Sequence, residues 1–353
     1  MVDDLRRLPL VCGVVIALVV AGCTGSGDDV VVQGITTLSP TTETQPTTTS
    51  PPSTAATTST QPSTSTSTTS TTVPTPQPAT PYEPASSEVL RDRKRLGGQF
   101  AQAVLTYDAD ATIEGHISNL NEDYGLEFDE TERALVGEAM DLGATNVGRV
   151  RYVQMGGNRA DRASLMVWVD QERLGSDGAL TEESRVVDVR VQLVDDEWTV
   201  VRLASVGGPR VERPADLSDL RAAVADDPRI SMPDSSRWDI YAGHTTDAML
   251  TRMMEIAEFT DYAVLVLSRG HPYRVFETES VSRHSVGQAM DVYAVGGELV
   301  VDSRFEGSPT WTLANDLFQN GIGSIGSPWA FDGFGGRSFT DDVHQDHLHI
   351  TSL

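Results

Sequence analysis

Two short stretches near the C-terminus hold most of the histidines of this chain. Six of the seven histidines lie after residue 240, and four of them fall within residues 282–291 and 344–349. A zinc ion that performs chemistry takes three nitrogen or oxygen ligands and keeps one coordination position open. It also works beside a side chain that can handle a proton. The imidazoles and carboxylates of these two stretches therefore predict a catalytic metal site.

The first stretch, SRHSVGQAMD, combines a bend with a carboxylate that enters an apolar strand. Gly287 indicates the bend, because glycine tolerates a positive φ or a close backbone approach. Asp291 precedes the apolar residues 292–295, and a carboxylate is costly to bury there unless something neutralises it. A metal shared with His284 would do so. From this stretch alone, a carboxylate that accepts backbone hydrogen bonds in a turn stays an alternative.

The second stretch, HQDHLH, places His347 and His349 two residues apart. Residues two apart share one face of a strand, so the two imidazoles are expected to point the same way. Asp346 belongs to the opposite face of a regular strand, unless a bend at the start of the strand returns it to the site. A ligand pair made of His344 and His347 is a further alternative.

The two stretches together resemble the M15 family of zinc peptidases, which includes D-Ala-D-Ala carboxypeptidases and endolysins of peptidoglycan. The matching pattern is Ser282-x-His284-x-x-Gly287-x-Ala289-x-Asp291 followed by Asp346-His347-x-His349. The resemblance implies a zinc ion held by His284, Asp291 and His349. It also implies Asp346 as the base that accepts a proton from water, His347 as a donor beside the metal, and Ser282 as a substrate contact.

One part of the family pattern departs from this sequence. Carboxypeptidases of the family carry an arginine before the first motif, where it grips the terminal carboxylate of the substrate by paired hydrogen bonds. Arg269 and Arg274 lie in this region and are the candidates for substrate binding, but their spacing does not match. An endopeptidase, or a non-catalytic relative that binds wall peptides, therefore stays open as an alternative to a carboxypeptidase.

The charge of the chain excludes some partners. The net charge is −25, and 25 of the 26 basic residues are arginines, with Lys94 as the single lysine. We interpret this bias as a consequence of GC-rich coding. Affinity for nucleic acid rests on basic residues that neutralise phosphates, so this composition argues against DNA or RNA as a partner.

The N-terminus has the features of an export signal. Arg6 and Arg7 precede an apolar run, residues 8–20, that is too short to span a bilayer. The following Val20-Ala21-Gly22-Cys23 resembles a bacterial lipobox, which implies a lipid on the Cys23 thiol after removal of residues 1–22. Lipid on Cys23 would anchor the protein to the outer face of the cytoplasmic membrane, in reach of peptidoglycan stem peptides. Cys12 is the only other cysteine, so no disulfide is expected.

Residues 23–86 and 87–208 differ sharply in composition. The first segment is rich in Thr, Ser and Pro and is predicted to be a disordered linker. The second shows a helical pattern at Leu96, Phe100 and Val104, and then strands at 163–169, 187–193 and 198–203. Its pattern of helices and an antiparallel sheet resembles the NTF2-like fold. It contains no catalytic constellation, so an accessory role is expected, and recruitment of a partner protein is one version of that role.

Residues 209–353 are predicted to form the peptidase domain, which makes the fold class α+β with two domains. Residues 211–233 are expected to be a connecting arm. Amphipathic helices are predicted near 249–256 and 311–318, and strands at 262–267, 290–295 and 347–351.

Overall fold

The computed structural model describes residues 75–333 and 336–352, which belong to one compact unit. The predicted signal peptide, the lipid on Cys23 and most of the predicted linker lie outside the described residues. The described part contains helices and two sheets whose strands are mostly antiparallel, so the α+β class is confirmed.

The first half of the fold is built on a four-stranded antiparallel sheet in the order β1-β2-β3-β4. Three of these strands match the predicted ones, and Asp195 and Asp196 take a positive φ in the turn before β4. β1 was not predicted, because three glycines and two register irregularities break its alternation. The bounds are β1 (Thr145–Asn158), β2 (Arg162–Leu174), β3 (Leu180–Val194) and β4 (Glu197–Ser205).

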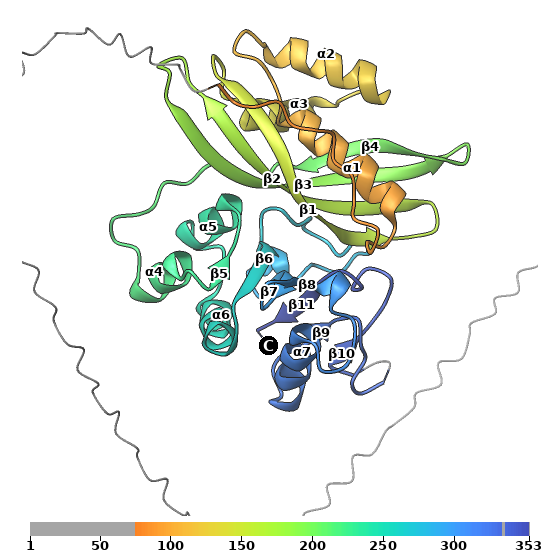
Figure 1. The fold of residues 1–353 in the computed structure, drawn as a ribbon, viewed down its shortest axis with the longest axis vertical. Helices are drawn as coiled ribbons and strands as arrows, with labels where there is room; N and C mark the ends of the chain where they lie inside the picture. Colours follow the sequence, from red (N-terminus) through yellow and green to blue (C-terminus); the bar gives the residue numbers. More distant parts are fainter. Residues whose placement is uncertain (1–74, 334–335, 353) are drawn as a thin grey trace, which may run out of the picture. The chain divides into compact units, whose positions relative to one another are not determined.

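Three helices cover one face of this sheet, as Figure 1 shows: α1 (Arg91–Val104), α2 (Ile113–Tyr124) and α3 (Glu130–Ala139). Glycines allow α1 to lie very close to its neighbours. A Cβ at Gly97 would come within 2.3 Å of the Leu165 side chain, and one at Gly98 within 2.3 Å of the Tyr82 ring. Residues 80–86, which the sequence assigns to the linker, are therefore part of the packed structure, and the folded part begins before residue 87. The Gln102 amide, which donates to the Thr80 carbonyl, agrees with this boundary.

The second half contains a seven-stranded mixed sheet with the path β10-β9-β11-β7-β6-β5, and β8 pairs with β7. The central pairs are antiparallel, whereas β5 with β6 and β9 with β10 are parallel. The predicted strands of this half all occur. Their bounds are β5 (Ile230–Ser231), β6 (Tyr262–Val266), β7 (Ala289–Val295), β8 (Glu298–Leu299), β9 (Ile325–Gly326), β10 (Ser338–Phe339) and β11 (Leu348–Thr351).

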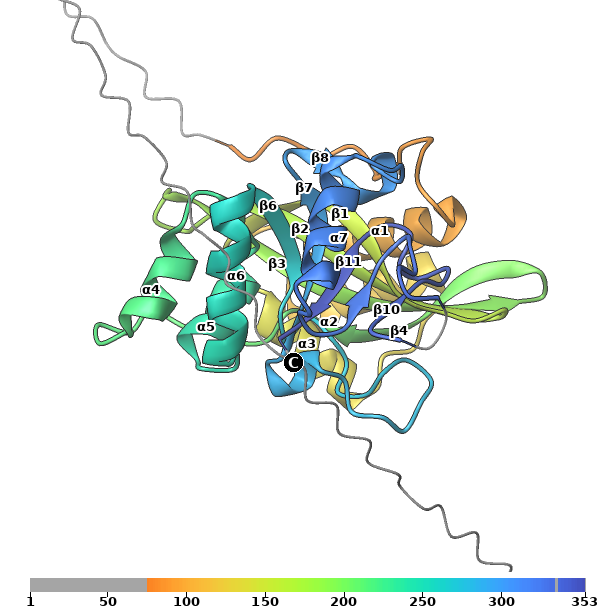
Figure 2. The same cartoon turned by 90° about the horizontal axis from the view of Figure 1, so that it is seen from below.

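Helices α6 (Asp247–Phe259) and α7 (Pro309–Gln319) pack on the outer face of the second sheet, in front of its strands in Figure 2. Both begin at a hydroxyl cap. Thr246 accepts from the Met249 amide and Ser308 from the Trp311 amide. The predicted connecting arm is more structured than expected, because it contains α4 (Asp219–Asp226) as well as β5. Helix α5 (Asp234–Tyr241) follows it, and two short 3₁₀ turns complete the fold, η1 (His284–Val286) and η2 (Val300–Asp302).

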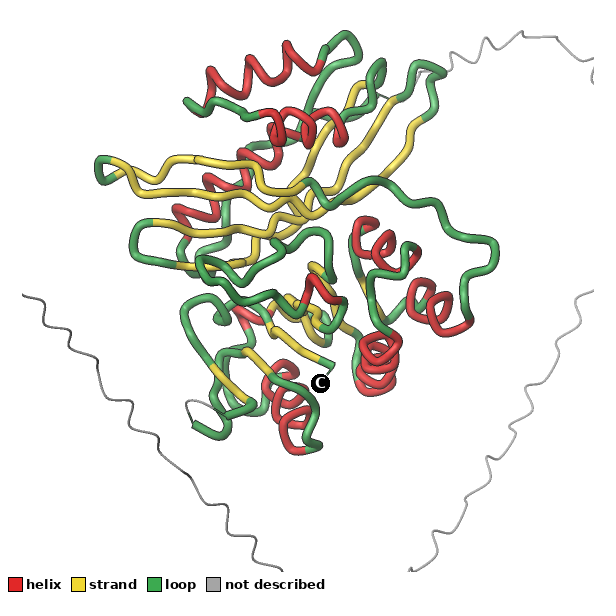
Figure 3. The backbone as a smooth tube through the Cα atoms, turned by 180° about the vertical axis from the view of Figure 1, so that it is seen from behind, coloured by secondary structure: helices red, strands yellow, loops and turns green. Residues whose placement is uncertain are grey.

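The two sheets face each other across an apolar layer. The helix-free face of the first sheet contributes Tyr152, Met166, Trp168 and Val186, and the second sheet contributes residues of β6 and β7. The rings of Tyr152 and Tyr293 stack with centroids 4.7 Å apart. Helices α1, α2, α3, α6 and α7 therefore lie on the outer sides, an arrangement that can be followed from behind in Figure 3. Helix α5 is the exception, because it lies against β3, where the Ser235 hydroxyl accepts from the Val186 amide. This layer brings β1 next to β7 and β11, the strands that carry the motif residues.

Candidate metal centre

Three side chains from the two motifs converge on one point. The Asp291 Oδ1 lies 3.1 Å from the His284 Nε2 and 2.9 Å from the His349 Nδ1, and the two imidazole nitrogens are 3.1 Å apart. Ligands of a tetrahedral zinc at their usual distances lie about 3.3 Å from one another. Two imidazoles and a carboxylate are ligands that zinc accepts, so these residues fit a zinc ion. Within residues 75–333 and 336–352 no other group of three such side chains could hold a metal ion.

His284 is positioned by the bend that the sequence predicts. Gly287 takes a φ of 67°, and a Cβ there would come within 2.0 Å of the His244 carbonyl oxygen, so only glycine fits. The His284 Nδ1 lies 2.6 Å from the Leu267 carbonyl oxygen, to which it donates. That hydrogen bond leaves the lone pair on Nε2, the atom that faces Asp291 and His349. The ring of His271 stacks on the ring of His284 at 4.3 Å.

Asp291 and His349 are brought together by sheet register. They are direct cross-strand partners on β7 and β11, so their side chains share one face. Burial alone would raise the pKa of the Asp291 carboxyl, but the neighbouring imidazoles outweigh burial and hold that pKa well below its usual value. Burial lowers the pKa of His349 to about 4. At neutral pH both groups are therefore in the form that binds a metal.

His347 and Asp346 form a second layer of the site. His347 lies just before β11 and points toward the metal ligands, with its Nε2 3.9 Å from the Asp291 Oδ1. Its Nδ1 lies 2.7 Å from the Asp346 Oδ1. Burial alone would lower the pKa of His347, but the Asp291 and Asp346 carboxylates outweigh burial and raise it above its usual value. The His347 and His349 side chains therefore both point toward Asp291, as expected for residues two apart.

Asp346 itself is turned away from the open side of the site. Its side chain is fully buried and does not line the cleft. The Oδ2 is 2.6 Å from the Lys94 Nζ and accepts a hydrogen bond from the Met155 amide at 3.0 Å. Burial alone would raise the pKa of this carboxyl, but the Lys94 ammonium and His347 outweigh burial and lower it. No bend returns Asp346 to the face of the metal ligands, so it holds the His347 ring and does not face the position expected for a base.

The converging ligands open into a cleft of about 320 Å³. Its walls come from both halves of the fold. β1 and the following turn contribute residues 155–159, and the loop before His284 contributes Val275, Phe276 and Val281. A Cβ at Gly157 would lie 2.3 Å from the Phe276 ring, so this glycine lets the loop approach β1. Two further residues that the sequence singled out line the cleft: Ser282, predicted to contact substrate, and His344, the alternative ligand. The Ser282 hydroxyl accepts from the His284 amide, and the His344 Nδ1 pairs with Asp341 at 2.7 Å instead of joining the ligands.

The two arginines predicted to bind substrate do not line this cleft. Arg269 lies against the buried Asp239 carboxylate at 3.4 Å and donates to the Pro209 carbonyl. Arg274 forms an ion pair with Glu279. The arginines that line the cleft are Arg159, at the turn after β1, and Arg283, inside the first motif.

The first half of the fold contributes site residues that sequence reasoning missed. Gln154 on β1 donates from its Nε2 to the Asp291 Oδ2 at 2.7 Å, and Tyr152 donates to the Asp346 carbonyl at 3.2 Å. Lys94 on α1 lies between Asp346 and Glu88, both of which it contacts. The one available signal was that Lys94 is the only lysine among 26 basic residues.

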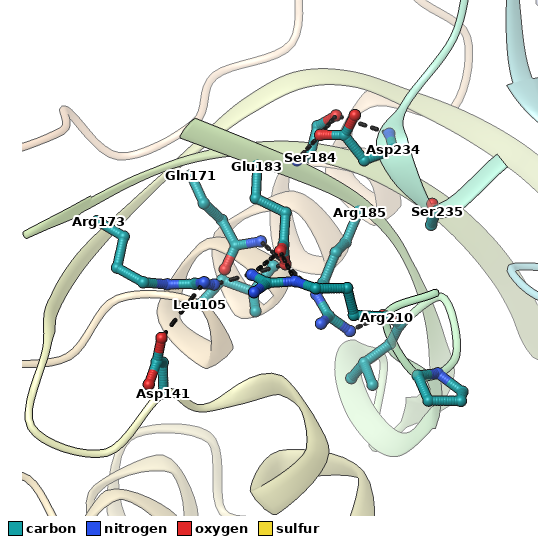
Figure 4. Close-up of polar contacts among 12 residues, drawn as sticks. Leu105, Asp141, Gln171, Arg173, Glu183, Ser184, Arg185, Arg210, Asp234 and Ser235 are labelled. Atoms are coloured by element: carbon teal, nitrogen blue, oxygen red, sulfur yellow. Dashed lines mark hydrogen bonds and ion pairs between the residues drawn. The ribbon is translucent and has the colours of Figure 1, made fainter. Parts of the chain in front are cut away.

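A second buried charged cluster joins the two halves at a different place, shown in Figure 4. The Glu183 carboxylate on β3 is held by Arg185 at 2.8 Å, Arg210 at 2.7 Å and Arg173 at 3.4 Å. Arg185 also donates to the carbonyls of Val206 and Gly208 in the connection that leaves β4. In the described part of the chain no imidazole forms a hydrogen bond or ion pair with Glu183.

Comparisons of the chain with protein-family models, with curated proteins and with solved structures found no match. Of the helices that the structure describes, none combines the length and the apolar character needed to cross a membrane.

Proposed function

We propose that this chain is a zinc-dependent peptidase that hydrolyses peptidoglycan stem peptides, as a D-Ala-D-Ala carboxypeptidase or as an endopeptidase. The observation that carries the proposal is the triangle of ligand atoms from His284, Asp291 and His349, with sides of 2.9–3.1 Å, at an open cleft. The spacing of these residues and their resemblance to the M15 motifs supply the reaction class. In this proposal residues 209–353 are an M15-like domain and residues 87–208 an NTF2-like accessory domain.

Zinc, when bound to these three residues, would supply a Lewis acid that lowers the pKa of a water and polarises a carbonyl. The chain supplies the proton chemistry through His347. Its Nδ1 is occupied by Asp346, so its Nε2 is free to accept a proton from the attacking water at the cleft and return it to the leaving amine. Asp346 keeps the ring oriented and stabilises the imidazolium, which leaves His347 as the general base in place of the acid that the motif implies.

The cleft favours a substrate with a carboxylate beside apolar groups. Arg159 and Arg283 supply the positive charge along its walls, and Val275, Phe276 and Val281 supply the apolar surface. A peptide that ends in D-Ala-D-Ala has a terminal carboxylate and small methyl side chains. Arg159 and Arg283 therefore replace Arg269 and Arg274 as the proposed carboxylate ligands.

The proposed location follows from the N-terminal sequence. A lipid on Cys23 and a linker rich in Thr, Ser and Pro would hold the folded part outside the cytoplasmic membrane, near the cell wall. Mass spectrometry of the membrane fraction tests this part. A mature N-terminus at Cys23 that carries a diacylglycerol supports it, and a soluble chain cut elsewhere contradicts it.

The direct test of the activity uses the full chain loaded with zinc and a stem peptide that ends in D-Ala-D-Ala. We expect about one zinc per chain, loss of hydrolysis on chelation, and a product shorter by one D-Ala if the enzyme is a carboxypeptidase. An endopeptidase gives cleavage of a cross-linked muropeptide instead. A chain that binds no zinc and hydrolyses neither substrate contradicts the proposal.

One observation favours a second candidate function, a non-catalytic module that binds wall peptides. The acid of the second motif does not face the cleft, because Lys94 and His347 hold it on the buried side. This candidate predicts binding of the same peptides without turnover. Isothermal titration with a stem peptide, followed by analysis of the mixture for products, separates the two functions.

A further inference from the structure

The candidate metal centre receives four hydrogen bonds or ion pairs from the first half of the fold. Gln154 donates to Asp291 at 2.7 Å. Asp346 contacts the Lys94 ammonium at 2.6 Å, the Met155 amide at 3.0 Å and, through its carbonyl, the Tyr152 hydroxyl at 3.2 Å. These four donors are at most 3% exposed. They come from α1 and β1, which precede the first motif by more than a hundred residues.

Gln154 fixes which oxygen of Asp291 faces the other ligands. The Oδ2 accepts from the Gln154 amide, and the Oδ1 is left toward His284 and His349. The Gln154 Oε1 is buried and has no hydrogen-bond partner among the described residues. A buried carbonyl without a partner costs folding free energy, so an apolar side chain would serve a purely structural role better. The amide is explained by its hold on Asp291.

Lys94 performs the corresponding task for Asp346. Its ammonium is fully buried, lies between the carboxylates of Asp346 and Glu88, and is 5.2 Å from the centre of the Tyr152 ring. An ammonium is a compact charge with three donors, whereas the guanidinium of arginine is wide and planar. A chain that otherwise uses arginine throughout has its one lysine at this position. Lys94 holds the carboxylate that in turn holds the His347 ring.

We propose that α1 and β1 form the second half of the metal centre, with Gln154 and Lys94 as positioning residues that act through Asp291 and Asp346. The domain at residues 87–208 is then part of the site itself and not a separate spacer. This proposal rests on the metal-binding part of the proposed function and is independent of peptide hydrolysis.

The test measures metal affinity and metal geometry in the full chain. In Gln154→Met the side chain keeps its size but loses the donor. We expect zinc affinity, measured by competition with a chromophoric chelator, to fall by about 10–100-fold. The visible spectrum of the Co²⁺-substituted protein should change as well. The melting temperature of the metal-free variant is measured as well, because the substitution removes both the unpaired Gln154 carbonyl and the donor to the buried Asp291 Oδ2. A merely structural residue would give a lower melting temperature with unchanged zinc affinity.

Lys94 needs a variant that keeps the charge balance, because Lys94→Met alone removes the ammonium that contacts both the Glu88 and the Asp346 carboxylates. The double variant Lys94→Met with Glu88→Gln removes one charge of each sign and keeps the net charge of the cluster. We expect it to fold and to show an altered Co²⁺ spectrum together with weaker zinc binding. Arg210→Met at the Glu183 cluster is the matched control, and its zinc affinity should equal that of the wild type.

Unchanged zinc affinity and an unchanged Co²⁺ spectrum in both the Gln154 variant and the double variant would overturn the proposal. These measurements require no substrate. A chain that binds zinc but hydrolyses no peptide therefore defeats the proposed function, and it still supports this proposal if Gln154→Met weakens zinc binding.

Discussion

Two buried charged clusters lie between the halves of this molecule, and they differ in whether they contact a residue that lines the cleft. In the first, Lys94 connects Glu88 to Asp346, and Asp346 contacts an imidazole that lines the cleft. In the second, three arginines surround Glu183. Arg185 also donates to two backbone carbonyls, and Arg173 lies 3.5 Å from the Asp141 carboxylate. The first cluster has an excess of carboxylate and the second an excess of cation. Burial and ion pairing are common to both, so neither property alone marks a functional site.

The interface between the two halves of the fold therefore serves two purposes. The Glu183 cluster ties β3 to the connection between the halves, and the neighbouring Asp234 carboxylate accepts from the Ser184 amide at 2.8 Å. The Lys94 cluster instead contacts residues of the candidate metal centre. We therefore expect the Glu183 cluster to control the free energy of unfolding and the Lys94 cluster to control the affinity for the metal.

The largest expected effect is the loss of a metal ligand. His349→Ala removes one of three ligands, and the several kcal/mol that a metal supplies to a transition state correspond to about 10³-fold in rate. We expect hydrolysis of the stem peptide to fall by at least that factor and zinc to be lost on dialysis. Glu183→Gln is the control and should retain zinc. Full activity in His349→Ala would contradict the proposed ligand set.

The next effect concerns stability at the second cluster. Glu183→Ala leaves three arginines without their shared partner, and breaking a buried pair in this way costs about 3–5 kcal/mol. Urea unfolding of the metal-free chain should show this loss, while the zinc affinity of the folded fraction stays that of the wild type. A Glu183 variant with normal stability and weakened zinc binding would reverse the roles assigned to the two clusters.

The two clusters should also respond to pH with opposite signs. Burial would raise the pKa of Glu183, but its arginines outweigh burial and lower it, so its contribution to stability is lost as the pH falls below the ordinary value near 4.5. Burial raises the pKa of Glu88, so its contribution is lost as the pH rises above that value. Melting temperatures between pH 3.5 and 7 check this. Glu183→Gln should reduce the loss of stability in acid, and Glu88→Gln should increase it.

The smallest expected effect separates the arginines at the cleft from those away from it. Arg159→Ala removes a charged hydrogen bond to a substrate carboxylate, which predicts a loss of about 10-fold in kcat/KM for a peptide with a free C-terminus. The loss should disappear when the terminal carboxylate is amidated. Arg274→Ala is the control and should leave kcat/KM unchanged for the free and for the amidated peptide. Equal losses in the two variants would remove Arg159 from substrate binding.

Local pattern predicted much of this structure from the sequence. Alternating apolar residues identified β2 and β3, an apolar run identified β7, and the helical spacing of apolar residues identified α6 and α7. The resemblance of the two stretches to the M15 motifs predicted His284, Asp291 and His349 as ligands, and these three side chains lie together in the structure. Gly287 was identified as a bend for the reason that the structure gives, a positive φ under a close backbone oxygen.

Long-range pairing was not predictable by the same means. Gln154 and Lys94 lie 137 and 252 residues before their partners Asp291 and Asp346, and no local pattern connects such positions. β1 was missed because Gly148, Gly156 and Gly157 interrupt its alternation, although Gly157 is what lets Phe276 reach the strand. The Asp346 side chain points to the opposite face from His347, as the alternation of side chains in a regular strand predicts. The bend that would have returned it to the metal ligands does not occur.

The position of His349 has a consequence for the order of events during synthesis. This ligand lies on β11, the last strand that the structure describes, whereas Lys94 lies on the first helix. A growing polypeptide holds at most two of the three proposed ligands until that strand emerges. In the proposed function, zinc would therefore be captured only after β11 has been synthesised.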